Sequence, residues 1–279
     1  MGVQDLNDWV GRTTEMADVV TAGPFRAMAA TLDREAASDS YEVVPPLWHW
    51  LYFLPHERQS MIGDDGHPKK GGFLPPVPFP RRMWAGGRLE FPQPLRLGDT
   101  IKRSSSIANI DRKQGRTGDL VFVEVRHEIA TAEGVVIIEK QDIVYRNMPE
   151  PGETNLPLKK ARLDYQFSTE IVPDPILLFR YSALTFNSHR IHYDQSYATQ
   201  VEGYPGLIVH GPLIATLLIE QLARECPQVR VVTFEFKAVS PLFHTSGFTV
   251  CGRIDGQSAS LWAIGPQGQL AMFATATLG

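Results

Sequence analysis

The chain of 279 residues is 43% hydrophobic and 10% aromatic, which suits one large globular domain or two of about 140 residues with a substantial core. Lysine and arginine number 27 against 31 aspartates and glutamates, for a net charge of −4; with no long basic block, nucleic acid is excluded as the main partner and a small-molecule substrate is expected. Two cysteines without a Cys-x-x-Cys motif argue against a disulfide framework or a structural zinc site, and the lack of an apolar signal or membrane-spanning run predicts a soluble cytoplasmic protein.

The first half of the chain is expected to form helices followed by strands. Helices are predicted at residues 25–34 and at residues 46–54, an aromatic segment that begins with proline. Strands are predicted by apolar and β-branched runs, the last two forming a hairpin-like pair, at residues 87–91, 100–103, 120–125 and 134–139.

A proline-rich segment, residues 71–87, lies between these helices and strands and contains Arg81, Arg82 and Trp84. Guanidinium groups suit carboxylates and phosphates, and an indole stacks on planar groups. These three side chains are therefore candidates for substrate binding. The alternative is that the prolines only shape a loop over the first sheet while the arginines face water.

A weak internal repeat divides the chain into two units. Residues 87–103 and 233–250 each contain a short strand with glutamate between apolar residues, a proline turn and a second strand. A proline-rich linker, residues 149–158, is predicted between an N-terminal unit, residues 1–148, and a C-terminal unit, residues 159–279.

The second unit repeats the order of helix and strands. Its helix, residues 212–225, has an apolar stripe wide enough to be enclosed, with Gly211-Pro212 at its start and Cys226-Pro227 at its end. Strands are predicted at residues 233–236, 247–250, 261–264 and 268–273. A buried helix before antiparallel strands in each half predicts an α+β fold, in which each sheet wraps one helix and the two units share a continuous sheet.

The densest group of polar side chains is FNSHRIHYD, residues 186–194, which follows an apolar run and is expected to be held in place. His189 and His192 are candidate acid–base groups, because imidazole titrates at about pH 6.5. An extended loop would separate them and a helical turn would bring them together, and the spacing is compatible with both. Two alternatives to catalysis are a metal site, for which no third well-placed ligand follows, and purely structural hydrogen bonds.

The segment GLIVHGPL, residues 206–213, runs into the start of the second helix. Free N–H groups and the positive end of the helix dipole at such a start can receive a carbonyl oxygen that becomes negative. Gly211 leaves this approach open because it has no side chain. The alternative, in which Gly211 serves only as an N-cap, is equally open.

Four segments together resemble a known family. YSALTFNSHRIHYDQSYA and GLIVHGPL are similar to the MaoC-like (R)-specific enoyl-CoA hydratases of the hotdog fold. PLWHWLYFLP and GGFLPPVPFPRRMWAGG extend the resemblance to the type 2 hydroxyacyl-thioester dehydratases, over nearly the whole chain. Bacterial members of that branch include mesaconyl-CoA and itaconyl-CoA hydratases. The resemblance implies a double hotdog with one productive site, built from the C-terminal unit and the tunnel between the units.

The resemblance also implies a catalytic pair, with one departure. In the single-hotdog relatives an aspartate and a histidine lie five positions apart in the pattern D-x-N-P-x-H. The histidine falls on His192, but the aspartate falls on Asn187, and an amide accepts no proton. Either His192 moves both protons, or His189 or Asp194 has taken over part of the task.

The activity that the resemblance implies is reversible addition of water to a short α,β-unsaturated acyl-CoA, such as the dicarboxylate monothioesters mesaconyl-CoA and itaconyl-CoA. His192 would be the base, Asn187 would fix the water, and the Gly211 N–H would bind the enolate oxygen. Arg190, Arg82 and Arg81, in that order, are candidates to bind the free carboxylate. Other expected substrate contacts are His189, His210 and Trp84.

No metal and no cofactor other than the CoA of the substrate is expected, and no nucleotide-binding glycine motif occurs. A homodimer or larger homo-oligomer is an open expectation. Two other activities are alternatives: a 3-hydroxyacyl dehydratase acting on carrier-protein thioesters, and a hotdog acyl-CoA thioesterase.

Overall fold

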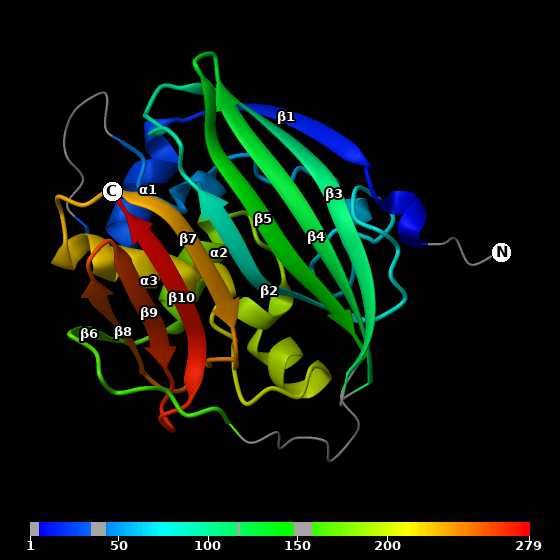
Figure 1. The fold of residues 1–279 in the computed structure, drawn as a ribbon. Coiled ribbons are helices and arrows are strands. Elements are labelled where there is room, and N and C mark those ends of the chain that lie inside the picture. The colour runs from blue at the N-terminus through cyan, green and yellow to red at the C-terminus, as the bar shows by residue number, and fades with distance from the viewer. Residues whose placement is uncertain (1–5, 35–42, 116–117, 148–157) are drawn as a thin grey trace.

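The computed structural model of the protein describes residues 6–34, 43–115, 118–147 and 158–279. Its described strands form one ten-stranded antiparallel sheet in the order β1-β3-β4-β5-β2-β7-β10-β9-β8-β6. Figure 1 shows this sheet running from β1 at one edge to β6 at the other and curving around the helices. Since helices and antiparallel strands share one core, the predicted α+β class is confirmed.

Each half of the chain supplies one half of the sheet. The first half-sheet contains β1 (Thr13–Val19), β3 (Thr100–Gly115), β4 (Gly118–Thr131), β5 (Gly134–Arg146) and β2 (Arg81–Glu90). The second contains β7 (Val231–Ala238), β10 (Leu270–Leu278), β9 (Ser258–Ile264), β8 (Phe248–Asp255) and β6 (Phe167–Ile171). The predicted hairpin is confirmed as β4 and β5, which are longer than expected because the alternation of buried and exposed residues continues along β4.

The repeated strands are β2 and β7, and they pair with each other in the middle of the sheet. Leu89 lies opposite Phe234 in the antiparallel register, and these are equivalent positions of the repeat. Pairing of equivalent residues is what a two-fold relation between the two halves requires. The weak internal repeat is thus a structural one.

Helix α3 (Gly211–Glu225) confirms the helix predicted in the second half, and the second half-sheet curves around it. Leu213, Ala215 and Leu218 are fully buried against β8, β9 and β10. The proline at its second position and the non-helical Cys226 after it mark the predicted ends. The enclosed apolar stripe therefore sets both the position and the rotation of this helix.

The first half has no long central helix, and the helix predicted at residues 46–54 is wrong. This segment contains one 3-10 turn, η2 (Trp48–Leu51), between Leu47 with φ of 72° and Phe53 with φ of 55°. Both are left-handed conformations, which cannot continue a right-handed helix. The helix predicted at residues 25–34 is confirmed as α1 (Ala22–Thr31), three residues nearer the N-terminus.

A proline-rich loop packs against the first half-sheet. Val77 of this loop is fully buried and packs with Ile107, Val121 and Tyr145 in a separate apolar cluster. The prolines therefore do shape a loop over the first sheet. Residues 149–157 of the predicted linker lie outside the described residues, and no helix of the described ranges is long and apolar enough to span a membrane.

Candidate active site

The polar segment 186–194 begins just after helix α2 (Pro175–Leu184) ends. The Asn187 N–H donates to the Ser182 carbonyl oxygen at 2.8 Å, which ties the segment back to the helix. The Asn187 Oδ1 then accepts the His189 N–H at 3.0 Å, a local turn typical of this residue type. The segment is therefore held by a packed helix, as its sequence predicts.

A 3-10 turn, η4 (Arg190–His192), decides between the two arrangements that the histidine spacing leaves open. Side chains three residues apart lie above one another in such a turn. The ring centroids of His189 and His192 are 5.5 Å apart, in an edge-to-face orientation. The two candidate acid–base groups therefore share one site.

The His192 ring is buried, with 8% of the residue exposed. Its Nδ1 lies 2.8 Å from the Ile208 carbonyl oxygen, and because a carbonyl only accepts, Nδ1 must carry the hydrogen. Burial lowers the pKa of His192 to about 4, although the hydrogen bond to Ile208 acts in the opposite direction. Nε2 therefore has a free lone pair at neutral pH.

His210 packs against one face of the His192 ring. The two imidazoles stack with centroids 3.7 Å apart and planes inclined by 18°. His210 is fully buried, and its Nε2 lies 2.8 Å from Ser182 Oγ. Burial, reinforced by the charges of His192 and His189, lowers the pKa of His210 well below its ordinary value. The position of His210 suits a support for His192 better than a substrate contact.

Gly211 follows His210 directly and begins α3. Within the described part of the chain, the Gly211 N–H donates to no acceptor. The nearest atom to the position that a Cβ would take is the Trp84 carbonyl oxygen, at 3.8 Å. An unpaired N–H group thus stands at a helix start, one residue from the stacked rings.

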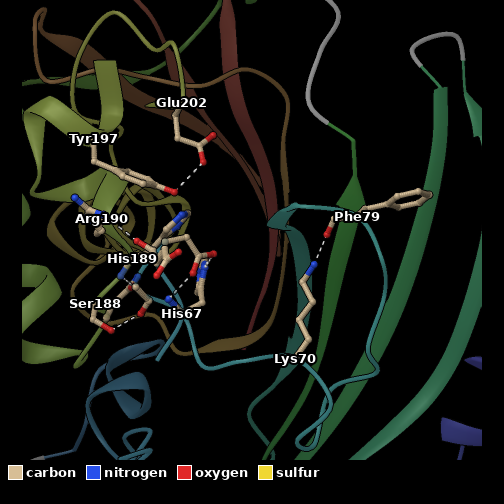
Figure 2. Close-up of polar contacts among 12 residues, drawn as sticks. His67, Lys70, Phe79, Ser188, His189, Arg190, Tyr197 and Glu202 are labelled. Carbon is tan, nitrogen blue, oxygen red and sulfur yellow. Dashed lines mark hydrogen bonds and ion pairs between the residues drawn. The ribbon is translucent and has the colours of Figure 1, made fainter. Parts of the chain in front are cut away.

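Two residues that sequence reasoning did not single out, Asp65 and His67, lie against this cluster. Asp65 Oδ2 is 2.9 Å from His67 Nδ1, and Asp65 Oδ1 accepts the His67 backbone N–H, also at 2.9 Å. The ring centroids of His67 and His189 are 3.9 Å apart, and Figure 2 shows the two side chains next to each other. Four histidine rings from both halves of the chain therefore form one continuous cluster.

Burial and charge set the protonation states of this cluster. Burial acts to raise the pKa of Asp65, but the hydrogen bonds and charge of His67 outweigh it and hold that pKa well below its usual range. Burial lowers the pKa of His67 despite the opposing hydrogen bond to Asp65, and the charge of Arg82 lowers it further. Burial, with the charges of His67 and His192, lowers the pKa of His189 to about 2. The cluster thus holds an ionised carboxylate and neutral imidazoles.

The loop 61–70 brings Asp65 and His67 across from the first half. The Asp65 carbonyl oxygen accepts the Arg190 backbone N–H at 2.9 Å, and the Gly66 carbonyl oxygen accepts from Ser188 Oγ. Gly66 has a φ of 89°, and a Cβ there would stand 1.8 Å from the Ser188 carbonyl oxygen. Only glycine permits so close an approach of the two segments.

Asp65, His67 and His189 also have the composition of a metal site. Each offers one ligand atom, and these atoms lie within 4.8 Å of one another. A carboxylate with two neutral imidazoles is a donor set that zinc accepts. The sequence offers no third ligand beside His189 and His192, whereas the structure places Asp65 and His67 next to His189. The expectation that the protein binds no metal stays a prediction.

The three candidate arginines have different surroundings. Arg190 binds Asp194 through Nε at 3.0 Å and Nη2 at 2.8 Å, and Arg81 forms a 3.1 Å ion pair with Glu202. Arg82 pairs with no carboxylate of the described residues, and its charge acts on the rings of His67 and His189. The structure therefore brings Arg82 to the histidine cluster without an ion-pair partner among the described residues.

Trp84 belongs to an aromatic group at the middle of the sheet. Its indole Nε1 donates to the Gly86 carbonyl oxygen at 2.8 Å. Its ring lies edge-on to Trp50, with centroids 5.0 Å apart, and 6.0 Å from that of Phe236. Trp84 therefore packs at the junction of the two half-sheets, and its carbonyl oxygen lies beside Gly211.

Asn187 borders a cavity of about 200 Å³ on the outer side of α2. Its other lining residues are mostly apolar or small: Phe179, Ser182, Ala183, Phe186, Ser188 and Tyr193. Because Oδ1 accepts the His189 N–H, the Asn187 amide nitrogen is the group left to donate to a water molecule.

A signal for the missed residues does exist in the sequence. Residues 63–68 read GDDGHP, in which Asp-Gly marks a turn and the histidine stands two positions after a carboxylate. The nearness of this turn to His189 is not encoded locally, because about 120 residues separate the hydrogen-bonded Gly66 and Ser188.

Comparison with known proteins shows the family of the chain. A family model described as hydroxyacyl-thioester dehydratase type 2 matches residues 47–244. The chain is 46% identical over 280 residues to a mesaconyl-C(4)-CoA hydratase of Chloroflexus aurantiacus, covering 100% of both chains.

Two solved structures share the fold at low sequence identity. A MaoC-like dehydratase superposes with a TM-score of 0.74 at 16% identity, over 98% of this chain and 99% of that one. A conserved hypothetical protein of Mycobacterium tuberculosis, which has a double hotdog fold, superposes with a TM-score of 0.59 at 13% identity, over 97% and 96%. The chain therefore has the double hotdog fold and belongs to the type 2 hydroxyacyl-thioester dehydratase family.

Proposed function

We propose that the protein is a hydro-lyase that adds water reversibly to a short α,β-unsaturated acyl-CoA, giving a β-hydroxyacyl-CoA. One observation carries this proposal: the His192 ring is held with a free Nε2 lone pair close to the unpaired Gly211 N–H. The two are linked by His210, which stacks on His192 and directly precedes Gly211. A base and an oxyanion donor in one water-excluding site are the two groups that conjugate addition needs. The activity named for the Chloroflexus relative is of the same kind.

The addition uses one proton equivalent. Nε2 of His192 takes a proton from water while the water oxygen bonds to the β-carbon, and the π electrons move to the thioester oxygen as an enolate. The Gly211 N–H donates to that oxygen, and the positive end of α3 stabilises its charge. His192 then returns the proton to the α-carbon. Asn187 holds the water through its amide N–H group.

The substrate is a dicarboxylate monothioester, such as mesaconyl-CoA or itaconyl-CoA. A free carboxylate needs a cation, and Arg82 is the candidate arginine that lies beside the histidines without an ion-pair partner among the described residues. Arg190 and Arg81, which the sequence placed first and third, already bind Asp194 and Glu202. The packed ring of Trp84 favours a short acyl group.

Incubation with mesaconyl-CoA and with crotonyl-CoA tests the activity. Loss of the enoyl absorbance without release of free thiol is the result expected of a hydratase. Release of CoA thiol would instead identify a thioesterase. Turnover of a crotonyl carrier protein but of neither CoA ester would favour the carrier-protein dehydratase.

The remaining expectations are part of the same proposal. The reaction needs no metal or cofactor beyond the CoA of the substrate. We place it in the cytoplasm, where a chain with two unpaired cysteines suits a reducing compartment. A homo-oligomer stays a prediction, which light scattering on the purified protein tests.

A further inference from the structure

Asp65 lies where the reaction lacks a carboxylate. In the family pattern an aspartate would stand at position 187, and this chain has Asn187. We propose that Asp65, acting through His67, supplies from the first half of the chain the carboxylate that position 187 lacks. The inference rests on the proposed hydration, because it concerns the positive charge that forms on the histidine cluster during that reaction.

The Asp65–His67 pair has the geometry of a carboxylate that orients an imidazole. A carboxylate only accepts, so the 2.9 Å contact from Oδ2 to Nδ1 places the hydrogen on Nδ1. The second hydrogen bond, from the His67 backbone N–H to Oδ1, fixes the carboxylate plane. His67 Nε2 then keeps a free lone pair, and the charge of Asp65, acting through the oriented His67 ring, stabilises the positive charge that forms on the cluster while His192 holds the proton of the water.

No other carboxylate among the described residues serves the cluster. Asp194, which the sequence left as a candidate, is occupied on both oxygens: Oδ2 by Arg190 and Oδ1 by the Tyr197 N–H at 3.0 Å. The cations that face His67, Arg82 and Lys70, both disfavour a positive charge on its ring. Across from it lie the rings of His189 and His192, which are also repelled by a protonated neighbour. Asp65 is therefore the group that compensates an imidazolium here.

The loop 61–70 is built to hold this pair in position. Its own hydrogen bonds close it at Gly63, whose N–H donates to the His67 carbonyl oxygen at 2.7 Å. The bonds from Arg190 and Ser188 described above dock it on the segment that carries the other histidines. Because hydrogen bonds hold the loop both internally and against the segment 186–194, its carboxylate needs little reorganisation during the reaction.

The same three ligand atoms could instead serve a metal ion, and the surroundings argue against that use. Asp65 and His67 already satisfy each other, and the charges of Arg82 and Lys70 would repel a divalent cation. These same cations are what make a compensating carboxylate necessary. The two uses predict different results for chelation.

The test compares Asp65→Asn with Asp64→Asn. The first change removes the charge and keeps the shape and the accepting oxygen, whereas the neighbouring Asp64 is exposed and its side chain makes no hydrogen bond or ion pair with the described residues. We expect kcat/KM for mesaconyl-CoA hydration to fall about 10²-fold in Asp65→Asn and to change less than about twofold in Asp64→Asn. The acid limb of the pH profile should move to lower pH in Asp65→Asn only, because the lost carboxylate no longer favours protonation.

A double-substitution cycle tests whether Asp65 acts through His67. His67→Gln alone should lower kcat/KM, and adding Asp65→Asn should then cost less than about twofold further. Full additivity of the two losses would overturn the link. An unmoved acid limb in Asp65→Asn would overturn it too, since a merely structural residue lowers activity without shifting that limb.

Two readouts do not depend on turnover. Titration of the 15N-labelled imidazoles by NMR should show a lower pKa for His67 in Asp65→Asn than in Asp64→Asn; an unchanged titration overturns the Asp65–His67 link alone. One tightly bound zinc per chain, with activity lost on chelation, overturns the inference in favour of the metal site. Absence of hydration by the unaltered protein refutes the proposed function, and the NMR result still decides whether Asp65 controls His67.

Discussion

Replacing Gly66 by alanine should detach the loop 61–70 from the catalytic segment. The added Cβ would stand 1.8 Å from the Ser188 carbonyl oxygen, and ordinary contact begins at 3.4 Å, so the loop must move by about 1.6 Å. That movement breaks the bonds of the Gly66 and Asp65 carbonyls to Ser188 and Arg190, each worth about 1 kcal/mol. A displacement of about 1 Å in a site is enough to lower the rate on the order of 10²-fold.

Gly71→Ala is the matched control. Gly71 is in the proline-rich segment that follows the same loop and has nearly the same backbone conformation, with φ of 92° against 89°, and its Cβ would meet nothing nearer than 3.9 Å. Both variants should lose roughly 1–2 kcal/mol for the left-handed alanine, and Gly66→Ala should lose about 2 kcal/mol more with its two hydrogen bonds, seen as a larger fall in its thermal midpoint. Only Gly66→Ala should lose kcat/KM for hydration. Equal activity of the two variants would refute the role of the docked loop.

Three further predictions concern the histidines and Arg82. His192→Gln should lower kcat for hydration on the order of 10²–10⁴-fold with unchanged circular dichroism; near-normal turnover would remove His192 from the mechanism. Because the pKa of His192 is lowered to about 4, kcat/KM should stay level down to about pH 5 and fall as His192 is protonated at lower pH. The unfolded chain takes up protons on its histidines below about pH 6.5, before the folded one does, so the thermal midpoint should also fall as the pH drops from there; a midpoint that rises would contradict the buried neutral state. Arg82→Gln should raise KM for mesaconyl-CoA about tenfold or more and leave that for crotonyl-CoA within about twofold, whereas equal effects on both would exclude a carboxylate contact.

Local patterns were sufficient for much of the second half of the chain. Helix α3 has its start and end marked by Gly211-Pro212 and Cys226-Pro227, and its apolar stripe is enclosed as predicted. The repeat and the hairpin of β4 and β5 were readable because alternation along a strand reports its own burial. His192 could be selected because the family motif lies within a single segment.

The segment at residues 46–54 shows how tertiary contacts override local preference. Its aromatic residues suit a helix by pattern, but the indole N–H of Trp48 reaches Glu220 on α3 at 2.9 Å and that of Trp50 reaches Glu139 on β5 at 3.0 Å. Two buried carboxylates on different elements need these donors. The left-handed Leu47 and Phe53 lie on either side of these two donors and end the helical conformation.

The sequence by itself thus determined the fold class, the repeat, the second helix and the histidine motif, because each is visible in the residue patterns of single segments. Only the tertiary structure decided which arginine is available to bind the substrate. Arg190 and Arg81 form ion pairs with carboxylates, and Arg82 forms none with the described residues. It also decided that Asp65 and His67 join the site, since their place depends on a loop of the first half docking on the second. Such contacts are selected by packing and electrostatics between distant segments, which no local pattern encodes.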